Sequence, residues 1–355
     1  MSTTGAVANV LTLIAIMLVL AFLFFGYIDR IGPIAGIVSN YTNANASQIG
    51  NESVANSTGT ANVTQANAQL LAYALNLINK DRNAYGLGNV TLSTEPSAQQ
   101  HSASMLVGDY FSHWDVFGMK PYMRYTLLGG RGAVSENIAY RYSAQCGIFG
   151  CSGDINVTQA LQEMEYSMMY NDSQCCNNGH RDNILDPYHN QVSIGIAYNA
   201  SNVYFTEDFI DNYIAWSKYG INQSSDEMLL YGTIAQPYTF SSVQIIYDSP
   251  VRNMTRAQLD NTSSYGYGNI VAGVVGNPSY YYPGIDTIVA DQYSTSSNRL
   301  GIAFGMKSLM QKYGAGEYIV LVWLNRTGSA GSGFVGSTYT VFVNSSKSVY
   351  TPSGV

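Results

Sequence analysis

The chain is short of charge, of basic runs and of cysteine. Charged residues make up 11% of its 355 residues, against about a quarter in typical soluble domains. The net charge is −7 and no basic run occurs, which argues against a nucleic-acid partner. Only four cysteines are present, and their spacing is not that of a zinc finger or zinc ribbon.

Familiar catalytic motifs are also missing. The chain has no G-x-S-x-G elbow, Walker loop, H-E-x-x-H motif or paired-glycine dinucleotide loop. Their absence argues against a Ser–His–Glu hydrolase, because neither Ser112 nor Ser135 has the sequence context of an activated nucleophile. Uncharged polar residues fill the surface instead, together with 29 tyrosines.

A long apolar run lies near the amino terminus. Residues from Ala6 to Ile28 carry no charge and are rich in Leu, Ile, Ala, Val and Phe. A helix of this length spans roughly 30 Å of hydrocarbon, so we predict one transmembrane anchor within residues 1–37. A cleaved signal peptide is the alternative, but no Lys or Arg precedes the run and no Ala-x-Ala site follows it.

Residues 38–68 are rich in Asn, Ser, Thr, Ala and Gly and cannot bury a core, so they predict a tether. Fourteen N-x-[ST] glycosylation sequons occur along the chain, and five of them crowd the tether. The sequons begin at Asn40, Asn45, Asn51, Asn56, Asn62, Asn89, Asn156, Asn171, Asn199, Asn222, Asn253, Asn261, Asn325 and Asn344. With the anchor, they predict a single-pass glycoprotein of the cell membrane whose bulk is extracellular.

Three helical patterns and a strand pair form a first predicted domain, residues 69–213. The helical patterns cover Leu71–Ile78, Pro96 to about Tyr110, and about Thr158–Tyr170. Residues 192–196 alternate as in a half-buried strand, and residues 203–209 follow a turn as the hairpin partner. This order predicts an α+β domain. His101 lies on the apolar stripe of the second helix and is expected in the core, whereas His189 is expected in a surface loop.

The sequence pattern changes after residue 213, and residues 214–355 predict an all-β second domain. Seven strands are expected, separated by turns rich in Gly, Pro, Ser and Asn. They cover Leu229–Ile234, Ser242–Asp248, Asn269–Val275, Thr287–Tyr293, Arg299–Met306, Glu317–Leu324 and Ser337–Asn344. Residues 318–323 are apolar on both faces, which is typical of a central strand. The pattern predicts an immunoglobulin-like sandwich, without the Cys pair of a true immunoglobulin domain.

Three short motifs lie tens of residues apart in the first domain. They are FSH around His113, SENIAY around Glu136 and NNGHRDNIL around His180. Followed by the alternating strand, they resemble the CAP superfamily of secreted proteins (cysteine-rich secretory proteins, antigen 5 and pathogenesis-related 1) in its short prokaryotic form. The resemblance covers about residues 70–209 and implies a CAP-like α-β-α sandwich.

The resemblance also implies that His113, Glu136 and His180 meet in one open cleft. Two imidazoles and a carboxylate, completed by water, suit Zn²⁺ or another divalent cation. The family usually adds a Glu from the helix before the last histidine. The expected position here holds Ser167, and Glu165 is the nearest candidate.

All four cysteines fall in the first domain, which suits disulfides in an oxidising compartment. Cys146 and Cys151 flank a Gly-Ile-Phe-Gly loop, whereas Cys175 and Cys176 are adjacent. A bridge between adjacent residues is expected to be strained. Crossed pairing between the two segments is therefore favoured, and it would hold the rim of the cleft together.

These observations predict a membrane-anchored, cell-surface binding module with a lipid, glycan or protein ligand outside the cell. The tyrosine-rich sandwich would add a second contact surface. A structural or adhesin-like envelope protein is the alternative. A zinc-dependent hydrolase with Glu136 as the base is the third and least favoured interpretation.

Overall fold

The computed structural model describes residues 60–147, 150–153, 155–262, 264–296, 298–328 and 333–350. All of them fall in one compact unit. The predicted anchor, residues 1–37, and most of the predicted tether lie outside these residues. Residues 60–68 of that tether form the start of the first helix. Within the described ranges, no helix combines the length and apolarity needed to cross a membrane.

The first part of the fold contains both helices and strands. Its elements are α4 (Thr60–Ala84), β1 (Thr91–Leu92), α5 (Ser97–Gly108), α6 (Pro121–Leu127), β2 (Ala133–Tyr142), β3 (Ala144–Gly147), β4 (Gly150–Gly153), α7 (Val157–Tyr170), α8 (Ser173–Cys176), α9 (Gly179–Ile184), β5 (Gln191–Tyr198) and β6 (Asn202–Asp211). The predicted helices are α4, α5 and α7, and the predicted hairpin is β5–β6. Strand β2, which carries the SENIAY motif, was not predicted as a strand.

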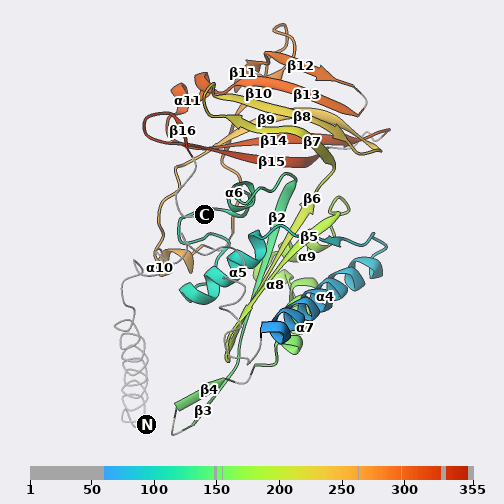
Figure 1. The fold of residues 1–355 in the computed structure, drawn as a ribbon, viewed down its shortest axis with the longest axis vertical. Coiled ribbons are helices and arrows are strands. Elements are labelled where there is room, and N and C mark those ends of the chain that lie inside the picture. Colours follow the sequence, from blue (N-terminus) through green and yellow to red (C-terminus); the bar gives the residue numbers. More distant parts are fainter. Residues whose placement is uncertain are drawn as a thin grey trace, which may run out of the picture. The chain divides into compact units, whose positions relative to one another are not determined.

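Strands β1, β5, β6 and β2 form one sheet in that order, with helices on both faces (Figure 1). Successive side chains of β6 point to opposite faces. Phe205 and Phe209 pack in the core beneath α4 and α7. Thr206 and Asp208 face α5 instead, where Thr206 Oγ1 accepts a 2.8 Å hydrogen bond from Ser102 and Asp208 accepts one from Ser97. The sheet therefore has two separate environments.

One prediction about the histidines is confirmed and one is wrong. His101 is buried in α5, with Nε2 2.8 Å from the carbonyl oxygen of Ser112. His189 is also buried rather than in a surface loop, with Nδ1 2.7 Å from Asp211 Oδ1. Its carbonyl oxygen accepts a 3.1 Å hydrogen bond from the buried guanidinium of Arg82. Because Arg82 and Asp211 come from distant segments, the local sequence could not reveal this burial.

The second part of the fold is rich in strands. Its elements are β7 (Ile214–Asn222), β8 (Glu227–Ile234), β9 (Tyr238–Asp248), α10 (Arg256–Leu259), β10 (Asn269–Val275), β11 (Asp286–Val289), β12 (Gln292–Thr295), β13 (Arg299–Gly305), α11 (Lys307–Tyr313), β14 (Gly316–Arg326), β15 (Phe334–Val343) and β16 (Val349–Tyr350). They form a six-stranded sheet, β11-β10-β9-β14-β15-β16, and a four-stranded sheet, β12-β13-β8-β7.

The sequence predicted a β-rich second part, and its two sheets share one apolar core. Leu230 and Ile302 of the four-stranded sheet share one apolar core with Val243 and Val320 of the six-stranded sheet. Strands β10 and β11 run parallel, which departs from the antiparallel pairing of an immunoglobulin-like sandwich.

The other face of the six-stranded sheet packs against the first part. Ile246, Ile319 and Leu321 share a core with Met123 and Tyr125 of α6. Strand β14 is therefore buried on both faces, as predicted from its sequence. This shared core fixes α6, and with it the residues that α6 contributes to the site below.

Candidate functional site

His113 and Glu136 lie together, joined by Arg124, which the sequence motifs did not include. His113 Nδ1 is 2.9 Å from Glu136 Oε1, and Arg124 Nη2 donates a 2.6 Å hydrogen bond to Glu136 Oε2. The Glu136 side chain is fully buried, and that of His113 is 13% exposed. Both oxygens of the Glu136 carboxylate therefore have a partner.

Further carboxyl groups surround Arg124. Asp208 stands opposite Glu136 in the β2–β6 register, and Glu95 Oε2 accepts a 2.5 Å hydrogen bond from Ser97 Oγ. Burial raises the pKa of Glu136 to about 7, although the Arg124 guanidinium opposes the rise. Burial also raises the pKa of Glu95 to about 8 and that of Asp208 well above its usual range. Near neutral pH, Glu95 and Asp208 therefore hold protons that exposed carboxyl groups would have lost.

The imidazole of His113 is neutral in this setting. Burial, followed by the positive charge of Arg124, lowers the pKa of His113 to about 3. A neutral imidazole donates from Nδ1 to an ionised Glu136 and leaves Nε2 as an acceptor. Because Arg124 already neutralises Glu136, the pair as arranged does not suit a divalent cation.

A strap from the β-rich part covers this pair. We define the strap as residues 249–268, between β9 and β10, of which Ser263 lies outside the described residues. The Tyr265 ring lies 4.8 Å from the His113 ring, centroid to centroid. Its hydroxyl accepts a 2.6 Å hydrogen bond from the backbone N–H of Glu136. Since β2 is an edge strand, Tyr265 supplies the acceptor that a neighbouring strand would otherwise provide.

The strap follows the segment around His113 along much of its length. Its contacts are Met254 N to Val116 O at 2.9 Å, Arg256 Nη1 to Asp109 Oδ2 at 2.5 Å, Phe111 N to Asp260 Oδ1 at 3.3 Å, Ser112 Oγ with Thr262 Oγ1, Trp114 Nε1 to Ser264 O at 3.2 Å, and Lys120 Nζ to Gly266 O at 2.8 Å. Leu259 adds a buried apolar contact with Met105 and Tyr110. The site is thus closed by the chain itself.

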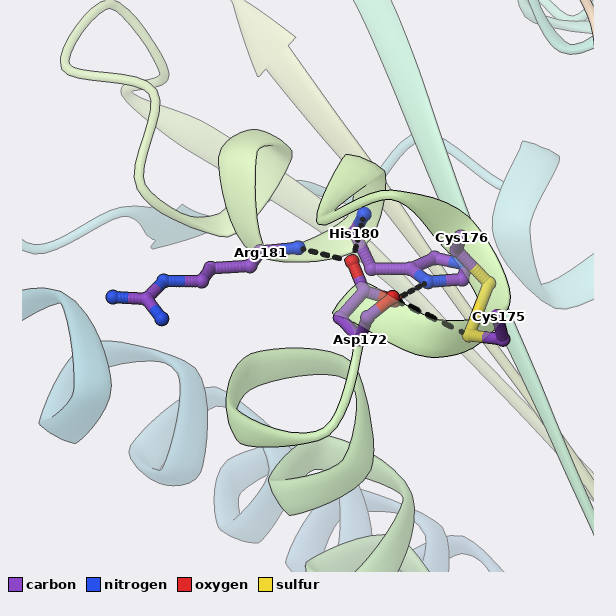
Figure 2. The surroundings of a disulfide bond; sticks show 5 residues. All are labelled: Asp172, Cys175, Cys176, His180 and Arg181. Atoms are coloured by element: carbon purple, nitrogen blue, oxygen red, sulfur yellow. Dashed lines mark hydrogen bonds and ion pairs between the residues drawn. A yellow bond between two sulfur atoms is a disulfide. The ribbon is translucent and has the colours of Figure 1, made fainter.

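His180 belongs to a different group of residues. Its Nδ1 is 2.6 Å from Asp172 Oδ1, and its backbone N–H donates a 2.8 Å hydrogen bond to Asp172 Oδ2. Figure 2 shows this pair beside the bonded Cys175 and Cys176, with the Arg181 side chain pointing away. One ligand atom from each of Asp172, Cys175, Cys176 and His180 lies within 4.8 Å of the others.

The predicted disulfide pairing differs from the structure. Cys175 is bonded to Cys176, so neither pairs across to the segment of Cys146 and Cys151 as we expected. The backbones of Cys146 and Cys151 stand opposite each other in the β3–β4 hairpin, and their side chains lie outside the described part of the chain. Asn177 ends α8 in the αL conformation. The spacing of the cysteines alone does not predict this turn.

The residues implied for one cleft are divided between two faces of the sheet. Glu136 and Asn137 are consecutive in β2, so their side chains point to opposite faces. Asn137 Nδ2 donates hydrogen bonds to His180 O and to Glu207 Oε2, both at 3.2 Å. No hydrogen bond or ion pair between described side chains joins His180 to His113 or Glu136. The structure therefore unites His113 with Glu136 and places His180 with Asp172.

Glu165 also lies on the His180 side. It is buried in α7, where burial and the neighbouring carboxyl group of Glu207 raise its pKa well above the usual range. This pair keeps at least one proton at neutral pH, because two adjacent buried carboxylates repel each other.

Some of the site residues that the sequence analysis missed could have been found from the sequence, and others could not. Asp172 lies eight residues before His180, so a local search for a histidine partner would have found it. Arg124 lies twelve residues before Glu136, near the same motif. Tyr265 comes from the β-rich part, and no local pattern connects it to the site.

The sequons differ in exposure among the described side chains. Asn89, Asn156, Asn171, Asn199, Asn222, Asn253 and Asn261 are exposed, whereas Asn325 and Asn344 are half-buried. The sequons at Asn40, Asn45, Asn51 and Asn56 and the side chain of Asn62 lie outside the described part.

Residues 75–209 match the model of the CAP family, described as the cysteine-rich secretory protein family. This match confirms the resemblance that the motifs suggested. An extracellular protein containing an SCP domain from Bacillus anthracis str. Ames, of known crystal structure, is 25% identical to this chain. The alignment covers 39% of each chain, with a TM-score of 0.28. No curated protein matches the chain.

Proposed function

Because residues 75–209 carry a CAP domain, we propose that the chain is a cell-surface binding protein. Residues 1–37 anchor it in the membrane, residues 38–68 lead outward, and the two folded parts lie outside the cell. The exposed tyrosines of the loop between β10 and β11 make the ligand contacts.

The observation that carries the proposal is the exposure of Tyr280 and Tyr281. They are 68% and 78% exposed, more than any other large apolar or aromatic side chain in the described residues. Tyrosine offers an apolar ring and a hydroxyl together, with little conformational entropy to lose on binding. Residues 276–285 carry no charge, so the loop favours a neutral polar ligand, and we propose a glycan.

The closed CAP site supports binding over hydrolysis. A hydrolase with Glu136 as the base needs water at that carboxylate. Here Glu136 is fully buried and engaged by Arg124 and His113, and Tyr265 covers His113. Water would reach the carboxylate only after the strap had moved.

A glycan array probed with the full-length chain in detergent micelles tests the proposal. We expect retention on a discrete set of glycans, weakened about tenfold or more when two aromatic anchors are removed in Tyr280→Ser/Tyr281→Ser. The matched control is Tyr142→Ser/Tyr166→Ser, since these tyrosines are 58% and 56% exposed on other elements. No retained glycan, or equal loss in both variants, would sink the proposal. Ordered arrays of chains without glycan binding would favour an envelope role.

A further inference from the structure

The vicinal disulfide lies beside a histidine–carboxylate pair to which the proposed function assigns no role. Cys175 is exposed and Cys176 half-buried. Asp172 is 2% exposed, although it lies next to these surface cysteines. The four side chains converge on one point (Figure 2).

Hydrogen bonds hold this loop independently of the disulfide. Asp172 Oδ2 accepts from the backbone N–H groups of His180 and Arg181 at 2.8 and 3.2 Å. Asn177 and Asn178 reverse the chain with φ of 52° and 65°, a conformation that asparagine tolerates better than most residues. Opening the disulfide would therefore leave Asp172 and His180 in place and release two thiols beside them.

Whether Cys175 and Cys176 can bind a metal ion depends on whether their sulfurs form a disulfide or are reduced. Thiolates, not disulfide sulfurs, bind metal ions. Two thiolates and an imidazole form a ligand set that Zn²⁺ accepts, with the fourth tetrahedral position open to water. Asp172 acts as a positioning residue, because both its oxygens already orient the His180 loop.

We propose that the Cys175–Cys176 disulfide is a redox gate on a site for one soft divalent cation. An external dithiol reduces the bridge by exchange, so that its own two sulfurs become a disulfide and Cys175 and Cys176 become thiols. The cation then binds both sulfurs and one nitrogen of His180, and the two thiol protons pass to solvent. Exchange with an external disulfide reverses the step: the Cys175–Cys176 bridge forms again, the external disulfide takes up two protons and leaves as a dithiol, and the cation is released.

Cobalt binding to the full-length chain tests the gate, because Co²⁺ occupies zinc sites and absorbs light when thiolates bind it. After reduction with a phosphine under argon, we expect one Co²⁺ per chain and a thiolate-to-cobalt charge-transfer band in the near ultraviolet. The oxidised chain should show neither. Asp172→Asn should keep the band but weaken affinity about 10- to 100-fold.

The controls separate this site from the other cysteines and from misfolding. Cys175→Ser/Cys176→Ser should lose the band, whereas Cys146→Ser/Cys151→Ser should retain it. Alkylating the reduced wild-type thiols should abolish the band without any substitution. Absence of the band in the reduced wild type, or its persistence in Cys175→Ser/Cys176→Ser, would overturn the proposal.

Discussion

Arg124 organises the closed site at the scale of single residues. Its guanidinium bonds to Glu136 Oε2 and to the carbonyl oxygens of His113 and Met119, all within 2.9 Å. The nearby carboxyl groups of Asp115 and Asp208 also favour its charge. One buried cation therefore holds the Glu136 carboxylate together with the backbone at His113 and Met119.

Replacing this cation should strongly destabilise the fold. We expect Arg124→Met to lower the free energy of unfolding by about 3–5 kcal/mol, because the buried Glu136 carboxylate would lose its cationic partner. Arg141→Met is the control, since Arg141 pairs with Glu163 while both are nearly half exposed; its loss should cost at most about 1 kcal/mol. Urea denaturation would compare the two, and equal costs would contradict the role given to Arg124.

Glu95 should make stability depend on pH. Its pKa rises from 4.5 to about 8 on folding, so the folded state binds more protons than the unfolded state between these values. The contribution of Glu95 to stability is thus fully present below pH 4.5 and is lost as the pH rises through about 8.

Glu95→Gln removes this titration and keeps the shape of the side chain. Relative to wild type, the variant should gain thermal stability steadily from pH 4.5 to pH 8, as followed by circular dichroism. Comparing the two proteins cancels the titration of the buried histidines. A constant difference across this range would show that Glu95 does not titrate as described.

Among the elements, α5 and β5 approach each other closely at Gly195. A Cβ atom built on Gly195 would lie 2.0 Å from the carbonyl oxygen of Ala98. The backbone contact leaves no room for a side chain, and it sets the position of Ser97 and Ser102 above β6.

Gly195→Ala should therefore cost about 1–3 kcal/mol in the free energy of unfolding, because the helix must move away from the sheet. Gly88→Ala is the matched control, since no atom lies within 4 Å of a Cβ at that position; it should be neutral or stabilise by up to about 1 kcal/mol. Thermal denaturation of both variants checks this, and an unchanged Gly195→Ala would contradict the close approach.

The sequence predicted the fold correctly where neighbouring residues determine the structure. Apolar residues on both faces predicted that β14 is central, and it is buried on both sides. The prediction failed where partners were distant. Residues 287–293 were expected as one strand, but β11 and β12 belong to different sheets. The chain changes sheets around Ala290 and Asp291, and alternation along a segment does not encode which neighbour it pairs with.

The same limit applies to the site. The family resemblance implied that His113 and Glu136 meet, although they lie 23 residues apart in the sequence. The motifs did not separate Glu136 from Asn137, whose side chains face opposite sides of β2. Tyr265 comes from a segment 129 residues away, so only the packing of the two parts reveals it.

For the whole molecule, the two parts act as one body around a closed site. Tyr122 and Tyr125 of α6 share a core with Ile319 of the β-sandwich, and the strap runs back over His113. Under the proposed function, the ligand contacts come instead from the exposed loop that carries Tyr280 and Tyr281. Closure by the strap is the central claim of this account.

Amide hydrogen exchange at Glu136 tests that claim most directly. In the wild type, the Glu136 N–H donates to the Tyr265 hydroxyl and should exchange slowly. Tyr265→Phe keeps the ring over His113 but removes the acceptor, so the Glu136 amide should exchange about tenfold faster or more while other β2 amides are unchanged. Equal exchange rates at Glu136 in the two proteins would contradict closure of the site by the strap.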